Sequence, residues 1–131
     1  MSDDCETSSP APTAGPYAPV VRAGEWVITS GQLGVVPAPD GAPTLVGAGT
    51  AAQLRQALDN AAALLSSEGA SLSDVLKATV YLVDMNDFAE MNAVWVEAFG
   101  GHRPARTAVG VAALPLGASV EVEVWAYRPG I

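Results

Sequence analysis

Residues 102–126, HRPARTAVGVAALPLGASVEVEVWA, decide the fold because they predict two β-strands and a turn at the end of the chain. The predicted strands are TAVGVAAL (107–114) and SVEVEVWAY (119–127). The stretch is apolar and rich in small residues, yet it contains two of the five arginines of the chain. It also places Glu121 and Glu123 within a run of valines. A pair of core-like strands with charges of both signs therefore needs an explanation.

The alternation of the last strand allows two interpretations of these charges. Valines 120, 122 and 124 share one face, and Ser119, Glu121 and Glu123 share the other. One interpretation is a half-exposed strand with its acids in water, preceded by a surface arginine, Arg106, near a strand end. The other is a binding site in which Arg106 and the acids act together. The pattern alone leaves both interpretations open.

The spacing of these residues gives a geometric expectation. If the two strands pair about a turn near Leu116, residue 121 lies opposite about residue 111, and Arg106 lies roughly 16 Å further along the strand. One small ligand cannot bridge that distance. A subunit interface, a bulge or a strong twist would then have to bring Arg106 and Glu121 together, although a different register would remove the argument. An uncovered sheet face would also favour an oligomer.

The segments before this stretch predict one helix after a set of short strands. WVIT, within EWVITSGQLGVV (25–36), is a short apolar strand, and PAPDGAP (37–43) is a loop between strands. Thr50 and Gln53 have the spacing of a capping box at a helix start, and Gly69 is a suitable helix stop. The apolar face of this helix consists of Leu54, Ala57, Leu58, Ala61 and Leu65.

A further strand and a second helix follow. DVLKATVYLV (74–83) predicts a strand with Leu76, Ala78, Val80 and Leu82 on one side. The second helix is predicted to begin near Asp87 and to end at Gly100-Gly101. Its stripe of Phe88, Met91, Trp95 and Phe99 is interpreted as core. The order of strands, helix, strand, helix and strands predicts an α+β domain, with an antiparallel or mixed sheet and two helices on one face.

Composition limits the class of protein. The 131 residues predict one domain, residues 15–131, preceded by a flexible tail, residues 1–14, that is acidic and rich in Ser and Pro. The net charge is −8 and the basic residues are scattered, which argues against a nucleic-acid surface but not against one arginine that grips a small anion. No apolar run reaches the roughly 18 residues needed to cross a membrane, and no basic leader precedes an apolar segment, so we expect a cytoplasmic protein. The lone Cys5 cannot form an internal disulfide, and no cysteine cluster predicts a metal site.

Other candidate sites are weaker. Ser30-Gly31 follows a strand, but its context is TSGQ and not GxSxG, and the only histidine, His102, lies beside a Gly-Gly helix stop. A Ser-His-Asp triad is therefore a weak hypothesis. GAGT (47–50) opens a helix but lacks the lysine of a phosphate loop, so it is interpreted as a helix cap.

Several short motifs, in order through residues 15–127, closely resemble the RidA (YjgF) family. They are GPY (15–17), SGQ (30–32), QLRQALDN (53–60), KATVYLVDMNDF (77–88), MN (91–92), RPART (103–107), and LP (114–115) followed by VEVE (120–123). The resemblance implies a chorismate-mutase-like α+β fold and a homotrimer with sites in the clefts between subunits. It implies hydrolysis of reactive 2-imino acids, namely 2-iminopropanoate, 2-iminobutanoate and enamine tautomers such as 2-aminoacrylate, to 2-keto acids and ammonia. No metal or organic cofactor is implied.

The resemblance also implies roles for individual residues. Arg106 would bind the substrate carboxylate, and a planar guanidinium suits that group because it donates two parallel hydrogen bonds. Glu121 would position the attacking water. Three residues, Tyr17, Ser30 and Gly31, would line the pocket, with Asn92 nearby. The chain departs from many relatives at Ala108, where they carry a cysteine, so any role of that thiol is lost.

Three functions remain open at this point. The leading hypothesis is an imine/enamine deaminase. A non-catalytic binder of small carboxylates such as 2-keto acids would need the same arginine clamp. Ribonuclease activity is a third hypothesis, against which the net charge of −8 and the single histidine weigh.

Overall fold

The computed structural model describes Thr13 and residues 15–130. The predicted tail, residues 1–14, lies outside the described residues except for Thr13, and so does Cys5. The described elements, with three short 3-10 helices labelled η, are β1 (Val20–Ala23), β2 (Trp26–Thr29), β3 (Gln32–Leu33), β4 (Val35–Pro37), β5 (Pro43–Leu45), α1 (Thr50–Ser67), η2 (Leu72–Asp74), β6 (Val75–Leu82), η3 (Met85–Asp87), α2 (Phe88–Phe99), β7 (Ala105–Gly110), η4 (Pro115–Gly117) and β8 (Val120–Tyr127).

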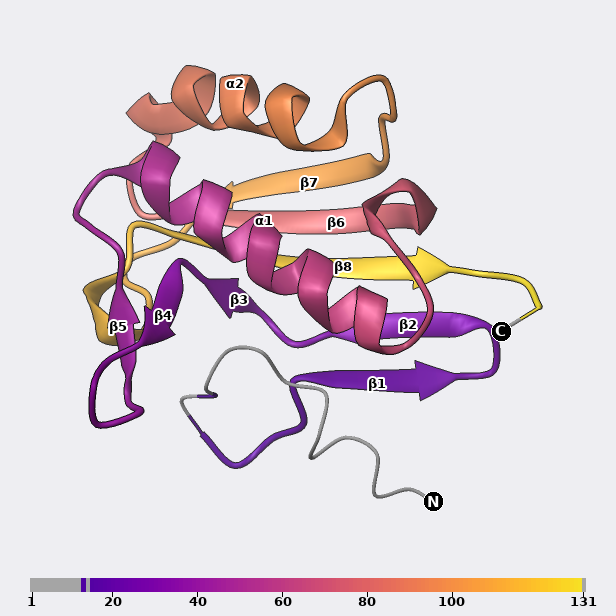
Figure 1. The fold of residues 1–131 in the computed structure, drawn as a ribbon. Helices are drawn as coiled ribbons and strands as arrows, with labels where there is room; N and C mark the ends of the chain where they lie inside the picture. Colours follow the sequence, from indigo (N-terminus) through magenta and orange to yellow (C-terminus); the bar gives the residue numbers. More distant parts are fainter. Residues whose placement is uncertain (1–12, 14, 131) are drawn as a thin grey trace.

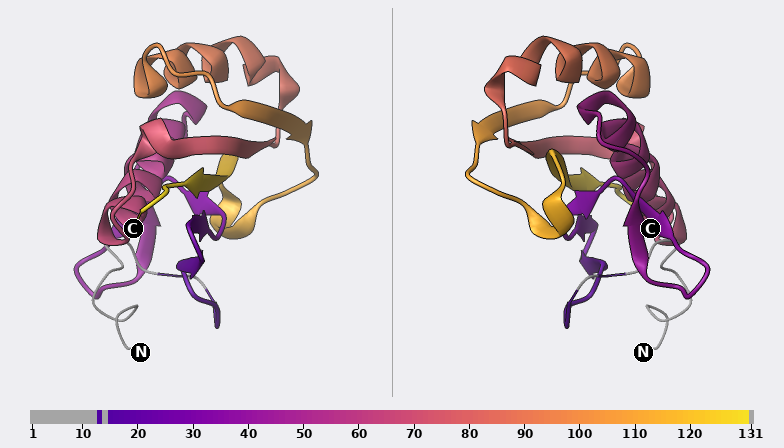
Figure 2. Two further views of the ribbon diagram at one scale, coloured as in Figure 1. Left: turned by 90° about the vertical axis from the view of Figure 1, so that its right-hand side faces the viewer. Right: turned by 90° about the vertical axis from the view of Figure 1, so that its left-hand side faces the viewer.

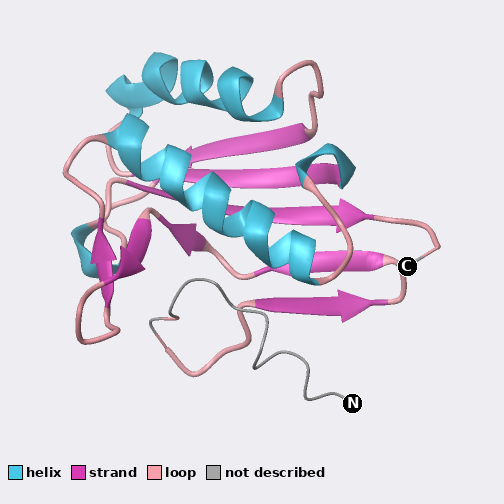
Figure 3. Ribbon diagram, in the orientation of Figure 1, coloured by secondary structure: helices cyan, strands magenta, loops and turns pink. Residues whose placement is uncertain are grey.

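The main sheet has the strand order β1-β2-β8-β6-β7, and β3 also pairs with β8 (Figure 1). All of its strand pairs are antiparallel except the parallel pair of β6 and β7. Strands β4 and β5 form a separate two-stranded sheet. Both helices lie on one side of the main sheet, as the side views and the colouring by element type show (Figures 2 and 3). The predicted α+β fold with a mixed sheet and two helices on one face is confirmed.

The core lies between the helices and this face of the sheet. All five residues of the predicted apolar face of α1 are fully buried, and so are valines 120, 122 and 124 of β8. Met91 and Trp95 of α2 join the same cluster. The amphipathic patterns of α1 and β8 therefore predicted which side each element buries, because apolar surface removed from water is the main stabilising contribution to folding.

The opposite face of the sheet has no helix over it. Tyr81 and Thr79 of β6 lie on this face and are the register partners of Glu121 and Glu123. Trp125, on the same face, keeps 43% of its surface exposed. In the single chain, both aromatic and acidic side chains therefore meet solvent on this face.

The predicted pairing of the last two strands is wrong. Strand β6 lies between β7 and β8, parallel to β7 and antiparallel to β8. The reason is that α2 connects β6 to β7 as a crossover, which brings β7 beside β6 in the same direction. Strand β7 also ends at Gly110 and not at residue 114, and residues 115–117 form η4.

A bulge corrects the predicted face of one residue in β6. The register of β6 against β8 shifts between Val75 and Lys77. Leu76, which was predicted to share a side with Ala78, is therefore 49% exposed, and Val75 is fully buried in its place. A bulge inserts one extra residue into a strand and so reverses the alternation on one side of it.

The predicted capping box of α1 does not form. The N-cap residue is Gly49, without a side-chain cap. The Thr50 hydroxyl instead donates to Asp87 Oδ2 at 2.7 Å, and Gln53 Oε1 accepts from the Ser119 amide at 2.9 Å. Both side chains thus tie α1 to neighbouring segments. The predicted stops are confirmed, since Gly69 and Gly100 have φ of 83° and 62°, which glycine adopts without the cost of a Cβ.

Candidate active site

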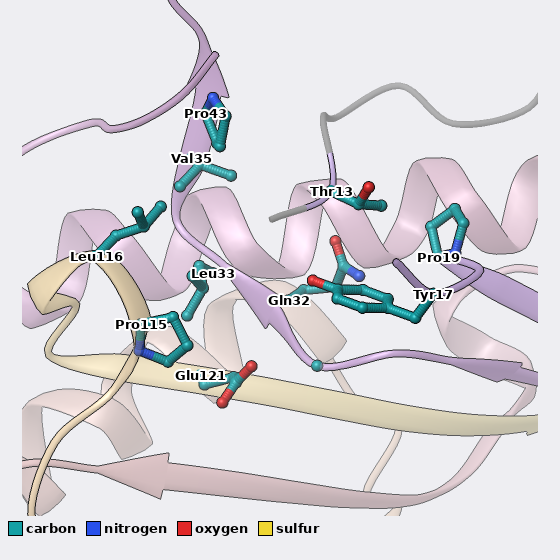
Figure 4. Close-up of a pocket in the computed structure, with 11 residues that line it drawn as sticks. Thr13, Tyr17, Pro19, Gln32, Leu33, Val35, Pro43, Pro115, Leu116 and Glu121 are labelled. Carbon is teal, nitrogen blue, oxygen red and sulfur yellow. The ribbon is translucent and has the colours of Figure 1, made fainter. Parts of the chain in front are cut away.

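One hollow surrounds the carboxylate of Glu121, and we call it the Glu121 pocket (Figure 4). Loops near the chain start, strands β3 to β5, η4 and β8 all contribute to it. Its lining residues are Thr13, Tyr17, Pro19, Gly31, Gln32, Leu33, Val35, Pro43, Pro115, Leu116 and Glu121. The wall is thus mostly apolar around one carboxylate.

Glu121 is held on the open face of the sheet by the register of β8. Its partners across the strands are Leu33 on β3 and Tyr81 on β6. Burial raises the pKa of the Glu121 carboxyl, and the negative charge of Glu123 raises that pKa further. Among the described residues, no side chain or amide hydrogen-bonds to this carboxylate. It is therefore available as a hydrogen-bond acceptor and as a base.

The SGQ motif shapes the space beside Glu121. A Cβ at Gly31 would contact the Glu121 carboxylate and lie 2.8 Å from its Cδ, so residue 31 must be glycine for this carboxylate position. Ser30 is not one of the lining residues. Its hydroxyl donates to the Ala18 carbonyl at 2.6 Å, and its amide donates to the Pro19 carbonyl at 2.9 Å. Ser30 therefore fastens the loop that presents Tyr17 to the pocket.

A second hollow, the Arg106 pocket, lies against α2. Its lining residues are Asn92, Trp95, Val96, Arg103, Pro104 and Arg106. The Arg106 guanidinium carbon lies 5.2 Å from the centre of the Trp95 ring and 5.6 Å from the centre of the Phe88 ring. Both distances are within the range of a cation–π interaction. The aromatic rings thus support the guanidinium while its N–H groups stay available.

Arg106 differs from the other arginines in its polar contacts. All five arginines are among the described residues, and four of them bind a protein oxygen. These are Arg22 to Glu68, Arg55 to Glu97, Arg128 to Asp74, and Arg103 to the Gly100 and His102 carbonyls. Within the described part of the chain, Arg106 has no hydrogen bond or ion pair. Burial lowers the pKa of its guanidinium, which is the expected effect on a cation that lacks a counter-ion.

The sequence did not reveal the aromatic support of Arg106. Phe88 and Trp95 were interpreted as core; Trp95 is buried, but the interpretation of Phe88 is wrong, because Phe88 lies at the start of α2 and keeps 39% of its surface exposed. Both rings nevertheless carry the guanidinium. The helical spacing of these residues fits either role, and only the placement of β7 beside α2 decides between them. Ala108, two residues after the arginine, lies partly buried against the core cluster and offers no thiol.

The two pockets do not meet within one chain. Arg106 is the register partner of Ala78, and Glu121 is the register partner of Tyr81. Ala78 is buried under the helices, whereas Tyr81 lies on the open face. Arg106 and Glu121 therefore project to opposite faces of the sheet, about 10 Å apart across two strand spacings and about 10 Å apart along the strands. Of the residues named from the sequence, Tyr17 and Gly31 lie with Glu121, and Asn92 lies with Arg106.

Other chemistry finds little support in the described residues. His102 Nε2 lies 2.6 Å from the Val75 carbonyl oxygen, outside both pockets. No group of three His, Cys, Asp or Glu residues in the described part of the chain could hold a metal ion. Across the same residues, every helix is too short or too polar to cross a membrane.

Comparison with known proteins agrees with this fold. A family model described as Endoribonuclease L-PSP matches residues 7–128, and the chain belongs to that family. The family includes the YjgF and RidA proteins, so the resemblance found in the sequence is confirmed.

Three relatives illustrate the match. A RutC family protein of Pyrococcus horikoshii is 44% identical over 114 residues, which cover 87% of this chain and 88% of that protein. The 2-iminobutanoate/2-iminopropanoate deaminase of Escherichia coli K12 is 40% identical over 131 residues, which cover 98% of this chain and 99% of that protein. The crystal structure of RidA from an Antarctic Psychrobacter has a TM-score of 0.86 and 39% identity, covering 96% of this chain and 99% of that one.

Proposed function

We propose that this protein hydrolyses 2-imino acids, such as 2-iminopropanoate and 2-iminobutanoate, to the 2-keto acid and ammonia. Membership of the family supports this, together with the deaminase relative that is 40% identical over nearly the whole chain. The observation that carries the proposal is the state of Arg106. A guanidinium that is held by two aromatic rings, without a polar partner among the described residues, is suited to a carboxylate ligand.

In the proposed complex Arg106 donates two parallel hydrogen bonds to the substrate carboxylate. This contact fixes the neighbouring C2 atom of the imine, which is already a strong electrophile when its nitrogen is protonated. Asn92 lines the same pocket and adds an amide that can orient the substrate. The free energy of binding at the carboxylate thus orients the reacting carbon, which is the main requirement for a reactive substrate.

Glu121 acts on the water in this proposal. Its carboxylate accepts a proton from water as the oxygen attacks C2, which gives a tetrahedral carbinolamine and a neutral Glu121. Glu121 then returns the proton to nitrogen and is again a carboxylate. As the C–N bond breaks, this carboxylate accepts the proton of the new hydroxyl group, so the 2-keto acid and ammonia leave, and Glu121 finally passes this proton to ammonia or to solvent. The raised pKa of Glu121 suits both steps, because it makes the carboxylate a stronger proton acceptor than an ordinary glutamate while the protonated form can still return the proton.

The proposal includes a homotrimer with sites between subunits. The opposite orientations of Arg106 and Glu121 support it, because one small substrate cannot reach both within a single chain. The bare sheet face supports it as well, since Trp125 and Val21 on that face are 43% and 49% exposed. In the trimer the Arg106 pocket of one subunit faces the Glu121 pocket of the next.

Ribonuclease activity is less consistent with the site. The net charge is −8, and neither pocket contains the single histidine, His102. An RNA-binding surface normally carries a patch of basic residues that neutralises phosphates. We therefore do not propose RNA as the substrate.

Hydrolysis of a freshly generated imine tests the proposal. A D-amino-acid oxidase with catalase produces 2-iminopropanoate from D-alanine, and the rate of pyruvate formation is compared with and without the protein. We expect a clear acceleration that depends on protein concentration. Binding of pyruvate without acceleration would instead assign the protein to the non-catalytic carboxylate binders. A cytoplasmic location belongs to the same proposal, and fractionation of expressing cells tests it.

A further inference from the structure

Leu116 has an unusual backbone conformation for its residue type. Its φ is 62° and its ψ is 13°, and it is the one non-glycine with positive φ among the described residues. The left-handed region is unfavourable for a residue with a Cβ and persists only where the surroundings impose it. Gly117 follows with φ of 73°, and the Ala118 amide donates to the Pro115 carbonyl at 3.1 Å to close the turn.

This conformation does not serve the core. None of the three residues of η4 is buried, and the Leu116 side chain keeps 49% of its surface exposed. A polar residue or glycine at this position would be expected if the turn only connected β7 to β8. The strained backbone instead presents an apolar side chain to the Glu121 pocket, which Leu116 lines.

The Glu121 pocket has an apolar side and a side that carries polar groups. Figure 4 shows Leu33 and Pro115 beside Glu121, Leu116 and Val35 beyond them, and Thr13, Tyr17 and Gln32 across the pocket. An apolar side chain of a substrate whose C2 atom lies beside the carboxylate would pack along Leu33 and Pro115 toward Leu116, because this side of the pocket is apolar. A methyl group would stop short of Leu116, whereas a branched four-carbon side chain would extend toward it.

We propose that Leu116 is a specificity-determining residue that favours 2-imino acids with long apolar side chains over 2-iminopropanoate. This inference rests on the proposed function and adds a substrate class to it. Polar side chains are disfavoured at the Leu116 end of the pocket, because Leu116, Val35 and Pro43 offer no side-chain hydrogen-bonding group in exchange for the water that they lose, and the polar residues Thr13, Tyr17 and Gln32 lie across the pocket (Figure 4). The strain at Leu116 is retained because it directs an apolar side chain to this end.

The test compares two substrates across three variants. The imino acids of D-leucine and D-alanine are generated with the oxidase, and kcat/KM is measured for each. Leu116→Asn is the main variant because Asn tolerates the left-handed conformation but is polar. Leu116→Met keeps an apolar chain of similar volume. Val46→Asn is the matched control, since Val46 is similarly exposed but does not line the pocket.

We expect Leu116→Asn to lower the leucine-to-alanine ratio of kcat/KM by about tenfold, the lower range for one apolar contact in a substrate pocket. Leu116→Met should keep most of the wild-type leucine-to-alanine ratio, and Val46→Asn should leave that ratio unchanged. The Tm of Leu116→Asn should not fall, because Asn removes strain. An unchanged ratio in Leu116→Asn would overturn the inference, and so would an equal loss on both substrates with a lowered Tm, which indicates a structural role.

A second measurement separates failure of the proposed function from failure of the role assigned to Leu116. If the wild-type protein hydrolyses neither imine, selectivity is measured from the binding of 4-methyl-2-oxopentanoate and pyruvate by calorimetry. A preference for the longer keto acid that Leu116→Asn removes supports the role of Leu116 even then. Equal preference in the wild type and in Leu116→Asn rejects it.

Discussion

Replacing Arg106 by Ala should abolish most of the activity and leave the fold intact. The guanidinium has no hydrogen bond or ion pair in the described residues, and its contacts are the Trp95 and Phe88 rings at 5.2 and 5.6 Å. Loss of these contacts lowers the free energy of unfolding by about 1–2 kcal/mol, taking each cation–π contact at its usual size. A change of that size leaves a typical domain folded.

The effect on catalysis should be larger than the effect on stability. Removing one side of a charge-assisted, hydrogen-bonded pair in a desolvated site costs about 2–5 kcal/mol. The value of kcat/KM for 2-iminopropanoate should therefore fall by roughly tenfold to a few thousandfold. Arg106→Lys should recover little of it, because an ammonium cannot make the planar two-bond contact.

The assay is steady-state imine hydrolysis beside a thermal melt for each variant. Arg103→Ala is the matched control, because Arg103 lines the same pocket but already donates to the Gly100 and His102 carbonyls. We expect it to change kcat/KM much less than Arg106→Ala does. Near-normal hydrolysis by Arg106→Ala would refute the carboxylate clamp, and unfolding of that variant would show that the arginine is structural.

Three further predictions concern Glu121 and the assembly. Burial and Glu123 raise the pKa of Glu121, so the decline of activity at low pH should begin above the pH expected for an ordinary glutamate. Glu123→Gln removes a repelling charge and should move this decline to lower pH. A decline that stays in place would contradict the coupling between the two glutamates. Gly31→Ala should displace the Glu121 carboxylate and so lower kcat, while the Tm stays near that of the wild type. Gly34→Ala should instead lower the Tm, because its Cβ would meet the Gln53 backbone. A lowered Tm in Gly31→Ala with an unchanged kcat would reject the role of Gly31 in placing the carboxylate. Light scattering of the purified protein at micromolar concentration should give a trimer mass, and a stable monomer would remove the shared site.

The sequence predicted the helices and strands better than it predicted which strands pair with each other. The alternation of valines in residues 120–124 and the helical spacing from Leu54 to Leu65 predicted the buried sides correctly, because burial follows local periodicity. Pairing depends on topology, which local patterns do not contain. The strand inserted between β7 and β8 follows from the crossover through α2, so the hairpin was the wrong expectation.

In the site, too, the sequence identified individual residues but not how the fold places them together. The motifs pointed to Arg106, Glu121 and Gly31, and each lines one of the two pockets. The motifs gave no sign that Trp95 supports the arginine, because an aromatic residue at helical spacing fits a core equally well. The conformation of Leu116 was also beyond the sequence, since leucine carries no preference for positive φ and only the closed turn imposes it.

The most direct test of the account is complementation between two inactive variants. The central claim is that Arg106 of one subunit and Glu121 of another serve the same substrate, because the two side chains project to opposite faces of one sheet. Arg106→Ala and Glu121→Gln subunits are mixed at equal concentration under conditions that exchange subunits, and hydrolysis of 2-iminopropanoate is measured. Random exchange in a ring of identical interfaces restores both native side chains at about a quarter of the sites, so activity should rise to about a quarter of the wild-type value. Activity that stays at the level of the separate variants after proven exchange would contradict the shared site.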